Sequence, residues 1–299
     1  MLRAADVHVD GYPTVAAMRA MGEVLQRESH GRLRMSVYHA GQLGRESDTI
    51  NLARFAALDI VRVNMAALNN PFPATRILSL PYVFDSVDHL RRTLDGEIGA
   101  DILRAFSSRG LVGLAFYDSG ARCFYNARRP VVTPGDLKGM KIRVPPSDIF
   151  MHLARALGAN PTPLSYGEVF SSLQTGLIDG AENNWPAFLT SRQFEVARYW
   201  SQTEHSYSPE ALLMSQSRFL SMSAADRELL LRAARESVAP MRVHWDRTEA
   251  DARNQVLAAG VQQLDVDREA FRAAAQPMLH QFLQQPELKR LYQRIRAIA

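Results

Sequence analysis

Strand and helix signals alternate along the first two-thirds of this 299-residue chain, and a long helical run follows them. Helices are predicted to start near Pro13, Glu46 and Ser86. The run 224–260 far exceeds the mean helix length, and Pro240 is expected to kink or divide it. A final helical region is predicted to begin at Asp267. Strands are predicted from apolar or alternating patterns at 33–38, 59–63, 111–117, 124–126, 141–144 and 178–181.

This order predicts an α/β protein with two lobes, and a chain that passes between them more than once. The helical run 224–260 is too long for one lobe. The near-continuous apolar segment 111–117 is typical of a strand in a buried parallel sheet. In open α/β sheets ligands bind beyond the carboxyl ends of the strands. Arg143 and Asn183 come at the ends of two predicted strands, so both are expected to face a ligand cleft.

Arg143 has a distinctive setting. It lies in a short apolar strand that Pro145 and Pro146 terminate, because proline cannot donate a ladder hydrogen bond. A guanidinium held at a strand end can bind a carboxylate through two parallel charge-assisted hydrogen bonds. A solvated arginine at the rim of the sheet is the alternative that the strand position alone leaves open.

Composition and missing motifs exclude several classes. The formal net charge is +4, lysine occurs only three times, and the arginines are interleaved with acids, so no nucleic-acid interface is expected. The single Cys123 allows no internal disulfide. Phosphate-binding glycine loops, HExxH, CxxC and GxSxG are missing, and the eight histidines have no metal-ligand spacing. We therefore expect no metal, no cofactor, no catalytic pair and no enzymatic activity.

Several motifs occur together in the middle third, in one order and at one spacing. They are YDSGAR at 117–122, DLKGMKIRV at 136–144, LGANPTP at 157–163, YGEV at 166–169 and LQTGLIDGAENN at 173–184. With these motifs the chain resembles the solute-binding proteins of tripartite ATP-independent periplasmic (TRAP) transporters. The resemblance covers nearly the whole chain, from His8 past Ser223.

The resemblance implies a two-lobed α/β periplasmic binding protein fold with a long lobe-spanning helix. The N-terminal lobe is expected to comprise residues 1–118 plus 209–247, and the C-terminal lobe residues 119–208 plus 248–299. It also implies an organic acid ligand between the lobes and transfer of that ligand to a small and a large integral membrane subunit. A periplasmic monomer is expected, as a mature form from which a signal peptide is absent.

Four binding residues follow from the family's motifs. The resemblance implies that Arg143 forms the main salt bridge to the ligand carboxylate and that Arg122 assists it. Asn183 is implied as a polar contact and Tyr166 as an aromatic ring over the ligand. Purely structural roles remain as alternatives for three of these residues. Arg122 could form an interlobe salt bridge, Asn183 could be a turn residue, and Tyr166 could be a core aromatic.

Segments 5–14, 62–64, 68–70 and 183–186 look like the subgroup that binds uronic acids, whose hydroxyls need many polar partners. The further candidate contacts are His8, Glu46, Asn64 and Ser147. His8 could instead anchor the first helix, and Glu46 and Ser147 could cap helices. The apolar Pro145, Pro146 and Phe150 depart from the subgroup and leave a smaller hydroxy or oxo acid open as the ligand. A stand-alone sensor module and, less favoured, an enzyme of sugar-acid metabolism are the alternative functions.

Overall fold

The computed structural model describes residues 1–298 as two compact units. The first comprises residues 1–64, 99–118 and 209–248, and the second comprises residues 65–98, 119–208 and the chain from Glu249 onward. The α/β fold class predicted from the sequence is confirmed.

The grouping differs from the expected lobes in residues 65–98, which we placed in the N-terminal lobe. Contacts from the other end of the chain explain the difference. Nε2 of His89 lies 3.0 Å from the carbonyl oxygen of Ile295, and Arg296 forms a 2.8 Å ion pair with Asp85. These contacts tie the segment to a C-terminal helix, and no local sequence pattern could have indicated them.

The first unit is built on a five-stranded mixed sheet. β1 pairs in parallel with β2 and β3, whereas β10 is antiparallel to both β3 and β4. Segment 111–117 therefore forms an edge strand with an antiparallel partner, and our expectation of a parallel strand there was wrong. The sheet order is β2-β1-β3-β10-β4, with bounds β1 Leu2–Ala5, β2 Met35–Tyr38, β3 Ile60–Asn64, β4 Leu111–Tyr117 and β10 Glu210–Ser215.

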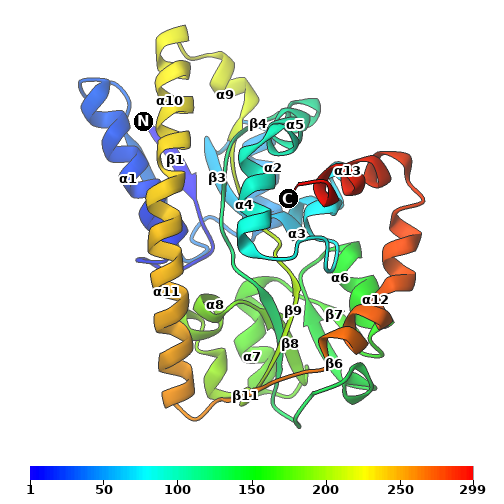
Figure 1. Ribbon diagram of the computed structural model, residues 1–299. Helices are drawn as coiled ribbons and strands as arrows, with labels where there is room; N and C mark the ends of the chain where they lie inside the picture. Colours follow the sequence, from blue (N-terminus) through cyan, green and yellow to red (C-terminus); the bar gives the residue numbers. More distant parts are fainter. Residues whose placement is uncertain (299) are drawn as a thin grey trace. The chain divides into compact units, whose positions relative to one another are not determined.

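Apolar helix faces cover this sheet. Val15, Met18 and Leu25 of α1 are buried against Leu230 of α10 and Trp245 of α11, and Figure 1 shows α1 and α10 side by side. The helices are α1 Pro13–Glu28, α2 Glu46–Arg54, α5 Glu97–Ala105, which begins in the second unit, η2 Phe106–Arg109, α9 Gln216–Leu220, α10 Ala224–Glu236 and α11 Val238–Ala258.

The predicted helical run 224–260 is divided, as expected, but at Ser237 rather than at Pro240. Pro240 lies in the first turn of α11, where its missing N–H costs no helical hydrogen bond and where it ends the preceding helix. Because α11 contributes residues to both units, it is the lobe-spanning helix that the sequence predicted.

The second unit contains a six-stranded mixed sheet in the order β11-β9-β5-β8-β6-β7. β6 is parallel to β7 and β8, and β5 is antiparallel to β8 and β9. The strands β7, β9 and β11 of this sheet and β10 of the first unit were not predicted from the sequence. The strand bounds are β5 Arg122–Asn126, β6 Lys141–Val144, β7 Asn160–Pro163, β8 Gly180–Asn183, β9 Tyr199–Ser206 and β11 Gln262–Leu264.

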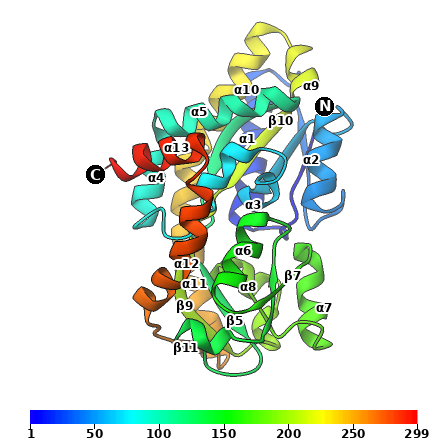
Figure 2. The same ribbon diagram turned by 90° about the vertical axis from the view of Figure 1, so that its right-hand side faces the viewer.

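Aromatic stacking fills the core of this unit. Trp185 stacks on Trp200 with ring centroids 3.6 Å apart, and Tyr125 stacks on the same Trp200 at 5.6 Å. Figure 2 shows α12 alongside α6. The helices are α3 Met65–Leu68, η1 Pro73–Leu78, α4 Val87–Asp95, η3 Pro134–Leu137, α6 Asp148–Ala156, η4 Tyr166–Glu168, α7 Val169–Gln174, α8 Trp185–Thr190, η5 Gln193–Glu195, α12 Arg268–Phe282 and α13 Pro286–Arg296.

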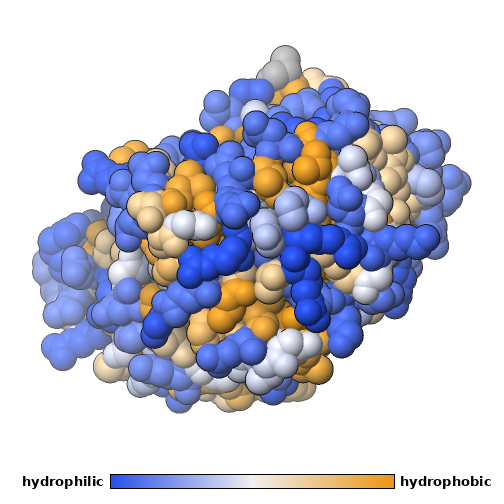
Figure 3. All heavy atoms as spheres, turned by 90° about the horizontal axis from the view of Figure 1, so that it is seen from below, coloured by the Kyte–Doolittle hydropathy of each residue, from blue (hydrophilic) through white to orange (hydrophobic). Residues whose placement is uncertain are grey.

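Hydrophilic and hydrophobic side chains are interleaved on the face that Figure 3 shows. Across residues 1–298, no helix combines the length and the apolar character that a membrane span requires.

The glycine of β8 permits the close strand packing that carries Asn183. A methyl group on Gly180 would overlap the carbonyl oxygen of Tyr125 and lie 2.7 Å from Cβ of Asn126. We predict that Gly180→Ala lowers the free energy of unfolding by about 1–3 kcal/mol, the usual cost of overpacking. Gly167→Ala is the control, because no atom lies within 4 Å of its added methyl group. Urea unfolding of both variants tests this, and equal stability would contradict it.

Candidate functional site

A buried ion pair organises the polar residues of the second unit. Arg122, on β5, forms a two-pronged contact with Glu182 of β8: Nε donates to Oε2 at 2.6 Å and Nη2 donates to Oε1 at 2.7 Å. Both side chains are almost fully buried. This pair agrees in part with the alternative role considered for Arg122, an interlobe salt bridge. Arg122 does form a structural salt bridge, but both partners lie within the second unit.

The same arginine orients the predicted contact Asn183. Its Nη1 donates to Oδ1 of Asn183 at 3.3 Å, and that oxygen also accepts the backbone N–H of Asn184 at 2.9 Å. Asn184 caps α8 by accepting the N–H of Ala187 at 2.8 Å. Side-chain hydrogen bonds therefore fix the end of β8 and the orientation of the Asn183 side chain.

Protonation states follow from this packing. Burial opposes ionisation of Glu182, yet the charge of Arg122 and hydrogen bonds from Arg122 and His205 outweigh it and lower the pKa of this carboxyl. Burial lowers the pKa of His205. Nε2 of this neutral histidine lies 3.3 Å from Oε2 of Glu182, and Nδ1 lies 2.9 Å from the hydroxyl of Thr203. The network assigns the ring proton to Nε2 and the accepting role to Nδ1.

Arg143 is held differently. It is 3% exposed, and its Nε and Nη2 donate to the carbonyl oxygen of Leu164 at 2.9 and 2.7 Å. The carbonyl fixes one edge of the guanidinium. Tyr166 begins η4, and its hydroxyl donates to the carbonyl oxygen of Ala187 at 3.3 Å. At the start of the same helix, Glu168 accepts the N–H of Ser165 at 2.9 Å, as the predicted capping box requires.

Ser147 stands at the N-cap position of α6, as expected, but its side chain accepts no bond from that helix. Instead its hydroxyl accepts from Nδ2 of Asn69 at 2.8 Å. Asn69 is itself buried and also accepts from the hydroxyls of Thr75 and Ser79 at 3.2 Å each. Ser147 is thus part of a buried hydroxyl–amide network.

A second polar cluster lies in the first unit and surrounds Arg62 of β3. The guanidinium pairs with Asp6, with Glu46 at 3.2 Å and with Glu210 at 2.7 Å. Burial disfavours its charge, but these three carboxylates together raise the pKa of Arg62. Asn64 completes the cluster: its backbone N–H donates to Glu46 at 2.7 Å and its side-chain Nδ2 donates to Glu210 at 3.0 Å.

His8 is attached to this cluster through the backbone. Its N–H donates to Oδ1 of Asp6 at 2.8 Å, and its ring stacks on Tyr12 with centroids 3.7 Å apart. Thr14 in α1 donates to Oδ2 of Asp6 at 2.7 Å. The arrangement matches the alternative that His8 helps to anchor the first helix, and the backbone of His8 reaches the Arg62 cluster through Asp6.

Each unit therefore brings some predicted residues together. Arg122 and Asn183 are hydrogen-bonded, as are Glu46 and Asn64, whereas Arg143 is fixed by Leu164 and Ser147 by Asn69. The residues that hold them were not predicted from the sequence; they are Asp6, Arg62, Glu182, His205 and Glu210. A charged residue inside an apolar strand, as in Ile60–Asn64, was the available signal.

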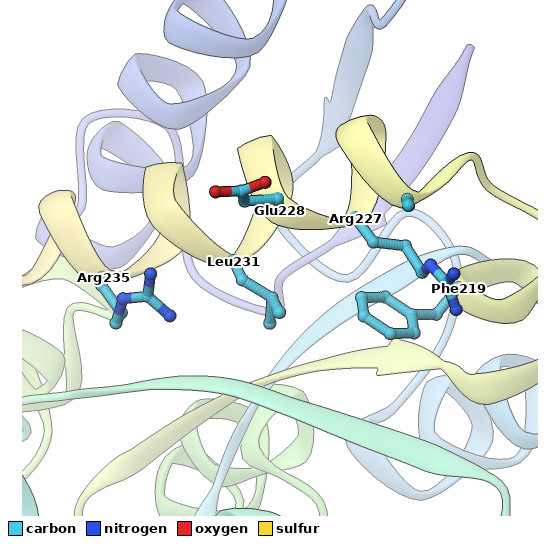
Figure 4. A pocket seen from close by; sticks show the side chains of 6 residues that line it. Phe219, Arg227, Glu228, Leu231 and Arg235 are labelled. Carbon is cyan, nitrogen blue, oxygen red and sulfur yellow. The ribbon is translucent and has the colours of Figure 1, made fainter.

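Figure 4 shows a separate surface hollow of about 330 Å³ on the first unit, lined by Phe219 of α9 and by Arg227, Leu231 and Arg235 of α10. Arg227 covers the Phe219 ring with its guanidinium carbon 5.8 Å from the centroid. The hollow contains none of the candidate residues. Within residues 1–298, no group of three or more His, Cys, Asp or Glu could hold a metal ion.

Comparison with known proteins identifies the family. Residues 4–285 match the family model described as "Bacterial extracellular solute-binding protein, family 7". The chain belongs to this family. It is thus a solute-binding protein of TRAP transporters and not an enzyme, which confirms the resemblance and the fold predicted from the motifs.

Three solved TRAP solute-binding proteins illustrate the similarity. One from Xanthobacter autotrophicus Py2 with bound β-D-galacturonate is 44% identical with a TM-score of 0.98, and each chain is covered completely. One from a Bradyrhizobium species in complex with galacturonate is 47% identical, TM-score 0.97, over 98% of each chain. One from Chromohalobacter salexigens with bound D-glucuronate is 37% identical, TM-score 0.97, over 100% of each chain.

The Arg122–Glu182 pair should dominate the stability of this solute-binding protein's second unit. We predict that Arg122→Ala lowers the free energy of unfolding by about 3–5 kcal/mol, because it leaves the buried Glu182 carboxylate without its partner. Arg128→Ala is the matched control, since Arg128 pairs with Asp179 at 2.7 Å but its side chain is 62% exposed. Its loss should cost at most about 1 kcal/mol. Similar shifts of the urea midpoint in both variants would contradict the prediction.

Proposed function

We propose that this TRAP solute-binding protein captures a hexuronate, galacturonate or glucuronate, in the periplasm as a monomer and delivers it to the small and large membrane subunits of its transporter. The observation that carries the proposal is the full-length similarity to two galacturonate-bound structures at 44% and 47% identity. The family is extracytoplasmic by description, which agrees with a periplasmic location.

In this proposal Arg143 binds the ligand carboxylate. The carbonyl of Leu164 orients the guanidinium through Nε and Nη2, and preorganisation of this kind lowers the entropic cost of binding. A buried carboxylate needs a cationic partner, because desolvation otherwise costs several kcal/mol. Nη1 of Arg122 and the amide of Asn183 supply further donors, and the Tyr166 ring covers the sugar face.

The hydroxyl groups are proposed to contact the first unit. Glu46 contacts Arg62, the backbone of Asn64 contacts Glu46, and the backbone of His8 contacts Asp6 of the same cluster. In this proposal their carboxyl, amide and imidazole groups contact the sugar hydroxyls. Ser147, on the second unit, contributes a hydroxyl. A polyhydroxylated acid satisfies such groups, whereas a short acid leaves them buried and unpaired, which is costly.

One observation favours a smaller hydroxy or oxo acid as the second candidate ligand. Phe150 is buried with its ring 5.2 Å from the guanidinium carbon of Arg122, so an apolar surface lies next to the charged group. Such a surface reduces the space and the polar partners available to a hexose ring.

Ligand class is testable by calorimetry. We predict that galacturonate or glucuronate binds more tightly than succinate, pyruvate or a neutral hexose. The neutral sugar lacks the charge for Arg143, and the short acids lack the hydroxyls. The screen titrates each compound alone and then in competition. Binding of a short hydroxy acid without binding of either uronate would overturn the sugar-acid proposal and retain carboxylate capture.

The salt bridge has its own test. We predict that Arg143→Ala loses at least about 2 kcal/mol of binding free energy, because the ligand carboxylate is then buried without its partner. Arg143→Lys should also bind more weakly, since an ammonium cannot reproduce the planar fork. Arg129→Ala, an exposed arginine of the same unit, is the control. Near-wild-type calorimetric affinity in Arg143→Ala would contradict this assignment.

A further inference from the structure

The Arg62 cluster contains more negative than positive groups. Three carboxylates, Asp6, Glu46 and Glu210, surround one guanidinium. The side chains of Arg62 and Asp6 are 0% exposed and that of Glu210 is 3% exposed, whereas Glu46 is 18% exposed. If all three acids are ionised, the cluster carries a formal charge of about −2 in a site that excludes most water, which is unfavourable.

Hydrogen bonds indicate where a proton fits best. Asp6 accepts at both oxygens, Oδ1 from His8 and Arg62 and Oδ2 from Thr14. Glu210 accepts at Oε2 from Arg62 and at Oε1 from Asn64. Both hydrogen bonds that the structure shows to Glu46 end on Oε1. Oε2 of Glu46 is thus the position where a proton displaces none of these bonds.

The charged groups around Glu46 come from each neighbouring element. β3 presents Arg62, β10 presents Glu210, and the segment after β1 presents Asp6. On its own helix, Asp48 accepts the N–H of Arg45 at 3.2 Å at the start of α2. Burial raises the pKa of Glu46 to about 7; Arg62 opposes this effect, and Glu210 and Asp6 reinforce it.

We propose that neutral Glu46 is a hydrogen-bond donor to the sugar acid, and that ligand binding is accompanied by uptake of one proton from solvent at Oε2. The inference rests on the proposed uronate function and adds a determinant of specificity. The Glu46 O–H donates to a hydroxyl or ring oxygen of the sugar, which accepts the hydrogen bond. The ligand removes the remaining water from this partly exposed carboxyl and brings its own negative charge, and both effects favour the neutral form.

Glu46→Gln is the decisive variant. It keeps an acceptor oxygen for Asn64 and Arg62 and replaces the O–H donor with an N–H donor that cannot ionise. Galacturonate is titrated by calorimetry at pH 8 in two buffers with different ionisation enthalpies. Wild type should take up close to one proton per ligand, and its Kd should weaken about tenfold between pH 6 and pH 8. The variant should take up none and show a flat profile.

A second measurement needs no ligand. A carboxyl pKa raised from 4.5 to about 7 in the folded state means that the folded protein holds more protons than the unfolded chain in this interval. Wild-type stability therefore falls as pH rises through it, relative to Glu46→Gln. The melting temperature of the variant should exceed that of wild type by a margin that grows from pH 5 to pH 8.

The outcomes separate the two proposals. Uronate binding without proton uptake in wild type, or uptake that persists in Glu46→Gln, overturns this inference and leaves uronate capture standing. A melting-temperature difference that is constant between pH 5 and pH 8 also overturns it. Binding of neither uronate overturns the proposed function and this inference with it.

Discussion

The buried contact between Arg122 and Glu182 is the interaction on which the polar half of the second unit depends. It joins β5 to β8, the two central antiparallel strands, and it leaves Nη1 to orient Asn183. Burying two charges is costly unless geometry and extra hydrogen bonds compensate. Here the Arg122 guanidinium binds the Glu182 carboxylate through two hydrogen bonds, and His205 provides a further contact to the same carboxylate. The charged residue that stabilises the sheet therefore also positions a proposed ligand contact.

The first unit also buries charged groups, but here acids outnumber the single arginine. Arg62 is buried among three acids, so its own charge is stabilised strongly while that of Glu46 is not. Asp6 and Glu210 are surrounded by donors from α1, β3 and the segment that carries His8. Arg62 thus contacts Glu46 directly and is linked to His8 through Asp6 and to Asn64 through Glu210, so residues distant in sequence form one polar cluster.

Sequence patterns indicated candidate binding residues but not the residues that hold them in place. Arg143 was recognisable because it lies in a short strand before two prolines and among ordered motifs, and Asn183 because it ends another motif. Arg62 was missed because a charge in an apolar strand resembles a surface residue until its partners, up to 148 residues away, are known. For the same reason the pairing of segment 111–117 was wrongly expected to be parallel: its partner β10 lies about a hundred residues later.

By itself the sequence determined the family, the α/β class, the long helix divided near Pro240 and the types of side chain available for binding a carboxylate. The family follows from a resemblance carried by ordered motifs. The fold class and the helix depend on local spacing, turn chemistry and periodicity, which a chain carries before it folds. Only the tertiary structure decided that Glu182 holds Arg122, that Asn69 rather than α6 engages Ser147, and that Glu46 meets two further acids around Arg62. Those outcomes depend on burial and on partners brought together from separate segments, because charge interactions become strong only where water is excluded.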